Sequence, residues 1–181
     1  MTALRTTSEK RRLGYKWLLT LDLILFKLCW VLLVVFQASV LTLTMAILIV
    51  RIALSENWRH RLRDAALVMV TGLVMDGAFS AVGLFRFQGG LLPLWMVMIW
   101  ASFALTLPLL AGFLHRCHTL VLVLTGAVNG VVAYLAGYLL DGIGFGLPLL
   151  QSLLVVGAAW SLYLPLTVIA LGRIQQGNSA A

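Results

Sequence analysis

The sequence predicts an all-α, polytopic membrane helix bundle with about six transmembrane helices and cytoplasmic N- and C-termini. Two observations predict it. The chain has 181 residues, of which 62% are hydrophobic and only 10% charged, and this leaves too few polar groups to cover a water-soluble domain. Most of its 13 Lys and Arg residues also gather in alternate gaps between long apolar runs, and gaps rich in positive charge stay in the cytoplasm.

The first apolar run, residues 17–54, is expected to cross the membrane twice. A single helix over it would be about 57 Å long at 1.5 Å per residue, whereas the hydrocarbon core is roughly 30 Å thick. Positive charge flanks both ends, beginning with the basic cytoplasmic segment 1–16. The spans are therefore placed at 17–36 and 38–54, with a break at Gln37-Ala38-Ser39. The segment can form two full spans or include a re-entrant leg.

The later apolar runs complete a transmembrane domain over residues 17–172. A basic loop, Ser55–Arg63, should return the chain to the cytoplasm, and Gly89-Gly90 suits an external turn. Pro93 favours a helix start, because its missing N–H would be unpaired there in any case. The four spans are expected at 64–84, 93–114, 119–140 and 148–171, followed by a polar tail, 173–181.

Ionisable side chains within the spans are candidate functional groups, because they are costly in a bilayer. Lys27 lies about 15 Å beyond Trp17 on a helical rise, near the midplane. Asp76 shares a helix face with the small residues Gly72 and Gly83, which allow close packing. Asp76 can make a structural interhelical bond, or it can bind substrate or transfer a proton. The candidate ligand-binding or buried polar network comprises Lys27, Asp76, Asn129 and Arg86.

A second small-residue face lies in the fifth span. Gly126 and Gly130 are four residues apart, and Gly137 follows at heptad spacing, a pattern that lets helix backbones approach closely. The partner can be another helix of this chain or a second copy of it. The packing glycines are thus Gly72, Gly83, Gly126, Gly130 and Gly137.

Several chemistries find no support in the sequence. The cluster His115-Arg116-Cys117-His118 lacks the second pair of ligands that a closed zinc site needs, and no catalytic or cofactor-binding motif is present. The net charge of +7 borders the apolar runs and forms no single patch, so a nucleic-acid partner is not expected. No metal, cofactor or catalytic residue is predicted.

Short stretches of the chain resemble an uncharacterised family of bacterial inner-membrane proteins, domain of unknown function 2878. The resemblance covers roughly residues 23–171 and rests on five stretches: Phe26–Trp30, Arg63-Asp64, Gly72–Asp76, Gly83–Phe85 and Pro93–Trp95. It implies a multi-pass protein of the bacterial inner membrane. It also implies a lipid-linked role, because members of the family sit near genes for membrane-lipid modification. No activity is assigned to the family.

Three functions are compatible with these observations. The leading hypothesis is a non-enzymatic accessory, scaffold or carrier component linked to membrane-lipid or envelope homeostasis, because the spans have short loops and no catalytic motif. The first alternative is a small-molecule transporter or substrate-binding membrane subunit with a midplane polar pocket. The second is a membrane-embedded, lipid-modifying enzyme that uses Asp76 as acid or base. The expected partners are the lipid bilayer, a lipid ligand or another membrane protein.

Overall fold

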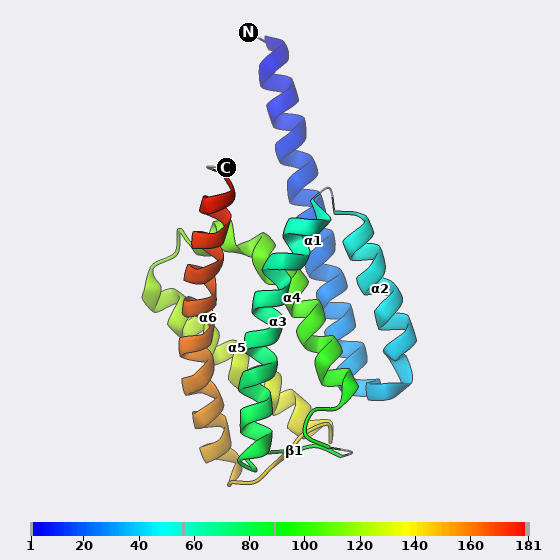
Figure 1. Cartoon of the computed structure of the whole chain (residues 1–181), viewed down its shortest axis with the longest axis vertical. Coiled ribbons are helices and arrows are strands. Elements are labelled where there is room, and N and C mark those ends of the chain that lie inside the picture. The colour runs from blue at the N-terminus through cyan, green and yellow to red at the C-terminus, as the bar shows by residue number, and fades with distance from the viewer. Residues whose placement is uncertain (1, 56, 89, 180–181) are drawn as a thin grey trace.

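The computed structural model describes residues 2–55, 57–88 and 90–179, with side chains from Trp17 to Gly177 within those ranges. Successive long helices run up and down, as predicted for a membrane helix bundle (Figure 1). The helices are α1 Thr2–Phe36, α2 Leu41–Ala53, α3 Trp58–Ala81, α4 Leu94–Leu114, α5 Thr119–Leu139 and α6 Leu149–Ser179. Residues 2–16 of the basic N-terminal segment and residues 173–179 of the polar tail are therefore helical extensions of α1 and α6.

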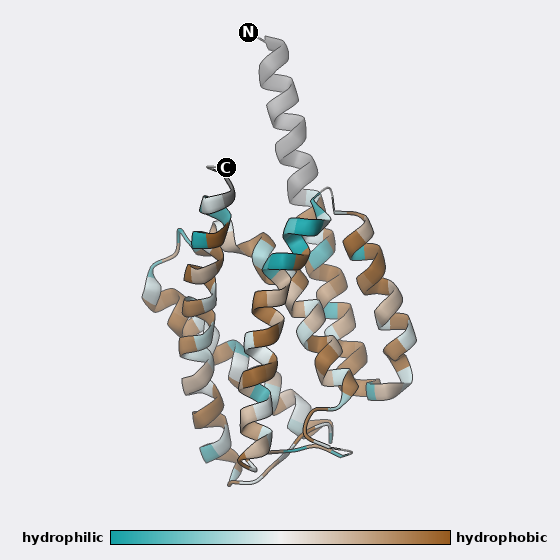
Figure 2. Cartoon of the chain, in the orientation of Figure 1, coloured by the Kyte–Doolittle hydropathy of each residue, from teal (hydrophilic) through white to brown (hydrophobic). Residues whose placement is uncertain are grey.

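Five helical stretches are long and apolar enough to cross a membrane. They are Trp17–Ala53, Trp58–Ala81, Leu94–Leu114, Thr119–Leu139 and Leu149–Gly177. Hydrophilic residues gather at the end of the bundle where α3 begins and α6 ends, here named the terminal end (Figure 2). The protein is thus a multi-pass membrane protein, whereas the count of six crossings and the cytoplasmic termini remain predictions.

The first apolar stretch folds back on itself. A short 3-10 helix, η1 (Gln37–Val40), separates α1 from α2, and Gln37 takes a positive φ of 46°. The chain reverses there, and α2 runs back beside α1 (Figure 1). The reversal falls at the position where the sequence predicts a break. Because α2 has 13 residues, it is only about 20 Å long at 1.5 Å per residue.

Helix α3 starts earlier than the basic loop prediction allows. That loop was expected to continue to Arg63, but α3 begins at Trp58. Hydropathy locates the edge of the apolar segment, whereas a helix continues into water wherever residues such as Arg and Leu favour it. The first turns of α3 are therefore a polar helical extension beyond the apolar segment.

Two loops pair at the end of the bundle opposite the terminal end, here named the strand end (Figure 1). Strand β1 (Phe85–Arg86) runs antiparallel to β2 (Gly144–Phe145). Gly83 follows the end of α3 in a left-handed conformation, φ 79°. The N–H of Gly83 donates to the carbonyl oxygen of Ser80, and the N–H of Leu84 donates to that of Phe79, which is the pattern of a Schellman motif. A Cβ built on Gly83 would meet no described atom within 4 Å outside its chain neighbours, whereas a Cβ built on Gly146 would lie 1.9 Å from the Gly83 carbonyl oxygen. The backbone of Gly83 therefore makes the turn and approaches the second loop closely.

Three of the other predicted packing glycines, Gly72, Gly126 and Gly130, lie where two helices approach closely. A Cβ on Gly72 of α3 would lie 2.2 Å from the Trp100 ring of α4. On α5, a Cβ on Gly126 would lie 2.3 Å from the Trp160 carbonyl oxygen, and one on Gly130 would lie 2.4 Å from the Trp160 side chain. The partner of the α5 face is therefore α6 of the same chain. A Cβ on Gly137 would instead lie 2.9 Å from the Ile143 side chain, in the loop that leads to β2.

Candidate ligand pocket

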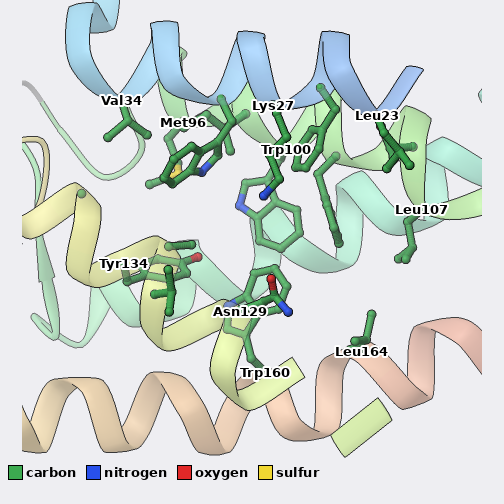
Figure 3. A pocket seen from close by; sticks show the side chains of 18 of the residues that line it. Leu23, Lys27, Val34, Met96, Trp100, Leu107, Asn129, Tyr134, Trp160 and Leu164 are labelled. Carbon is green, nitrogen blue, oxygen red and sulfur yellow. The ribbon is translucent and has the colours of Figure 1, made fainter. Parts of the chain in front are cut away.

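A cavity of about 390 Å³ lies between α1 and α4 on one side and α5 and α6 on the other (Figure 3). It exists because α5 packs along α6 and makes few backbone contacts with α1 or α4. Its lining is mostly aliphatic and aromatic. The aromatic residues in contact with it are Phe26, Trp30, Trp95, Trp100, Phe103, Tyr134 and Trp160.

Lys27 of α1 brings a positive charge into this pocket. Its Nζ lies 5.5 Å from the centroid of the Phe26 ring and 5.8 Å from that of Trp30, close enough for cation–π attraction. No ion pair to Lys27 occurs among the residues that the structure describes. A lysine can often reach back to the membrane surface, but in this structure the ammonium group lies beside these two rings, at the depth of residues 26–30.

Asn129 of α5 lines the opposite wall of the pocket from Lys27 (Figure 3). Its Nδ2 donates to the carbonyl oxygen of Thr125, one turn earlier on the same helix, at 2.8 Å. This bond orients the amide group along α5. The structure thus brings two of the four predicted polar residues, Lys27 and Asn129, to one pocket.

Asp76 does not line the pocket but lies behind its wall. Its side chain is on α3 and the residue is 0% exposed. Trp100 Nε1 donates to Oδ2 at 2.7 Å, and the Tyr134 hydroxyl donates to Oδ1 at 2.5 Å. The Trp100 and Tyr134 rings stand between Asp76 and the cavity. One carboxylate on α3 therefore connects α4 to α5, and this fixes the back wall of the pocket.

The two cations of the predicted network, Lys27 and Arg86, lie away from Asp76. Within the described part of the chain, Asp76 forms an ion pair with neither Lys27 nor Arg86. Arg86 belongs to β1 at the strand end, where it pairs with Gly144 of β2 and is exposed. The fourth predicted residue is therefore outside the pocket.

A second polar cluster, the Asp22 network, lies toward the terminal end of the bundle. Arg51 of α2 is only 2% exposed. It donates to the Asp22 carboxylate of α1 from Nε at 3.1 Å and from Nη2 at 2.8 Å. Arg61 of α3 donates to the same carboxylate. Two hydroxyls of α4 complete the cluster: Ser102 Oγ accepts from Arg51 at 2.7 Å, and Thr106 Oγ1 donates to Asp22 at 3.0 Å. One carboxylate thereby joins four helices.

The sequence interpretation missed this network because it treated the basic residues beside the apolar runs, which include Arg51 and Arg61, only as determinants of topology. A usable signal was present. In a hairpin of α1 and α2, Asp22 lies near the start of one leg and Arg51 near the end of the other, so the two lie at a similar depth. A hollow of about 570 Å³ lies beside the network. Asp64, which lines this hollow, accepts hydrogen bonds from Arg63 at 2.9 Å and from Gln175 at 3.1 Å. These bonds indicate a structural role for Asp64.

The fold and the pocket define a multi-pass, all-α membrane protein with a largely apolar cavity among its helices. The family model described as protein of unknown function (DUF2878) matches residues 19–166, more than half of the chain. The chain belongs to this family, as the short motifs indicated. No curated protein and no solved structure matches it. The case for a function therefore rests on the pocket.

Proposed function

We propose that the protein is a non-enzymatic membrane protein, a carrier or accessory component, that holds an amphiphile in the pocket between α1, α4, α5 and α6. The observation that carries this proposal is the lining of the cavity. Ligand pockets are mostly apolar and aromatic with a few placed polar groups, and here Lys27 and Asn129 are such groups among aromatic rings. An amphiphile matches both parts of this lining.

Binding is favoured over catalysis by the position of Asp76. A membrane enzyme that used this residue as acid or base would need to bring its carboxylate to the substrate. Asp76 is instead 0% exposed, and both of its oxygens accept hydrogen bonds from the pocket wall. Those two bonds would have to break before Asp76 reached a ligand.

The bacterial inner membrane, with both termini in the cytoplasm, is the proposed location. This is supported by the basic residues that flank the Trp17–Ala53 stretch. It is also supported by the loop between α3 and α4 at the strand end, in which Arg86 is the one Lys or Arg among the described residues. Positive charge on the cytoplasmic side is the usual determinant of orientation. A role in membrane-lipid or envelope homeostasis fits a protein that draws its ligand from the bilayer.

The test compares two tryptophan substitutions one turn apart on α5. Val132 lines the pocket and is 57% exposed, whereas Val128 is 60% exposed and lies outside the lining. Each protein is extracted with its surrounding lipid in polymer nanodiscs, and the amphiphiles retained after exchange into synthetic lipid are identified by mass spectrometry. We expect the wild type and Val128→Trp to retain the same amphiphile and Val132→Trp to lose it.

Two results of this experiment would contradict the proposal. One is a wild-type protein that retains nothing after lipid exchange. The other is retention that is unchanged in Val132→Trp, since the added indole occupies the cavity. Equal thermal stability of the two variants is the control for folding.

A further inference from the structure

The pocket contains a positive charge that no residue of the described chain balances. Lys27 is the cation. Among the described residues the buried carboxylates are Asp22 on α1 and Asp64 and Asp76 on α3, and Asp64 bonds to Arg63 and Gln175. Asp22 on the same helix is engaged by Arg51 and Arg61. Asp76 lies behind the pocket wall and accepts from Trp100 and Tyr134. Within the described part of the chain no counter-charge for Lys27 remains, and a ligand in the pocket can supply one.

The surroundings of Lys27 make that counter-charge important. An ionised side chain within the hydrocarbon region is costly unless it pairs or reaches water. The Lys27 ammonium group is held over the rings of Phe26 and Trp30, about 15 Å beyond Trp17 on a helical rise. An anion that enters the pocket would offset this cost, and charge complementarity thus defines one end of the ligand.

The rest of the pocket defines the other end. Most of the lining consists of residues such as Leu23, Val34, Ile99 and Leu110, which suit a hydrocarbon chain. Besides Lys27 and the aromatic residues, only Thr106, Thr125 and Asn129 of the lining carry polar side-chain groups, which are few partners for a large polar body. A phospholipid would have to bring its phosphate, its further headgroup and two chains to the depth of Lys27. A fatty acid brings one chain and one small carboxylate, which a cavity of about 390 Å³ accommodates more readily.

From these observations we infer that the ligand is a long-chain fatty acid in its anionic form, with its carboxylate paired to Lys27 and its chain along the aromatic wall. This inference rests on the proposed function, because it names the ligand of the same pocket. Asn129 on the opposite wall supplies a polar contact to the same headgroup region (Figure 3). The interaction is a charge-assisted pair without any covalent step.

The experiment measures the fluorescence of the tryptophans that line the pocket. Four tryptophans, Trp30, Trp95, Trp100 and Trp160, line the cavity, so a bound bromine-labelled chain will quench their emission. The full-length protein in phosphatidylcholine nanodiscs is titrated with brominated stearic acid, with the matching brominated alcohol and with a phosphatidylcholine that carries a brominated chain. We expect saturable quenching by the acid, reversed by unlabelled stearic acid, and only non-saturable quenching by the brominated phospholipid.

Substitutions of Lys27 identify the charge contact. In Lys27→Met the affinity for the acid should fall at least about tenfold, because the carboxylate loses its oppositely charged partner, whereas the affinity for the neutral alcohol should stay the same or rise. Lys27→Arg keeps the charge and should retain most of the affinity for the acid. Unchanged alcohol binding in Lys27→Met also shows that this variant is folded.

The outcomes separate this inference from the proposed function. Equal affinity for the acid in the wild type and Lys27→Met, or saturable binding of the phospholipid in place of the acid, would overturn the fatty-acid assignment and leave an amphiphile pocket in place. Absence of saturable quenching by all three probes, together with no retained amphiphile in the nanodisc experiment, would overturn both.

Discussion

Arg51 and Asp22 form a two-pronged ion pair inside the bundle, with Nε 3.1 Å from Oδ1 and Nη2 2.8 Å from Oδ2. The two residues belong to the two legs of the same hairpin, and neither is more than 6% exposed. Two parallel bonds of this kind fix the relative position of both backbones as well as contributing energy. The pair sets the register of α1 against α2.

Asn in place of Asp22 should strongly destabilise the protein. It would leave Arg51 buried without its counter-ion, and removal of one partner of a buried pair costs about 3–5 kcal/mol. The free energy of unfolding, measured by steric trapping in bicelles, checks this. The matched control is Asp141→Asn, because Asp141 is exposed and has a positive φ of 55°, which Asn tolerates well. Equal stability of the two variants would show that the pair contributes little.

Phe in place of Tyr134 should weaken the wall of the pocket. Asp76 would lose one of its two hydrogen bonds, and a buried acceptor left unsatisfied costs about 1–3 kcal/mol. The control is Tyr138→Phe, one turn later on α5, since Tyr138 is 38% exposed. Its loss of stability should stay below about 0.5 kcal/mol. Thermal unfolding followed by near-ultraviolet circular dichroism measures both, and a ranking in the opposite order would contradict the assigned role of Asp76.

Ala in place of Gly130 should disturb the contact between α5 and α6. The new Cβ would lie 2.4 Å from the Trp160 side chain, and overpacking of this kind costs about 1–3 kcal/mol. Gly112→Ala on α4 is the control, because no atom lies within 4 Å of its added Cβ. Since alanine favours helix, that variant should be stabilised by up to about 1 kcal/mol. Unfolding in increasing fractions of dodecyl sulfate compares them, and equal shifts would contradict the close approach.

Thiol labelling can test the predicted orientation. With Cys117 replaced by Ser, Arg86→Cys at the strand end and Arg59→Cys near the start of α3 should react with a membrane-impermeant maleimide from opposite sides. Intact cells should label only Arg86→Cys, and permeabilised cells should label both. The remaining thiol, Cys29, is buried and should stay silent. Labelling of both positions in intact cells would exclude the six-crossing arrangement.

The sequence predicted the helices well because apolar length and flanking charge are local properties. The break near Gln37 could be predicted in this way, since one helix over the whole stretch would be too long for the membrane. The close contacts of Gly126 and Gly130 followed from their spacing, but spacing could not choose between α6 and a second copy as the partner.

Contacts between distant residues could not be predicted. Asp76 accepts from Trp100 and Tyr134, 24 and 58 residues away, and an isolated sequence does not reveal which polar groups of other helices face a carboxylate. The same limit hid the role of Arg61 beside Asp22. The β1–β2 pair was also missed, because strands of two residues carry no alternating pattern. The pocket itself depends on how far α5 stands from α1 and α4, which is a property of the assembled bundle.

The short return leg of the hairpin has a consequence for the surrounding lipid. Helix α2 covers about 20 Å, whereas the hydrocarbon core is roughly 30 Å thick, and η1 reaches less far along the bundle than the strand pair (Figure 1). A segment shorter than the bilayer thins it locally. We therefore expect lipids beside α2 to be compressed in one leaflet and the protein to favour regions of the membrane that are already thin.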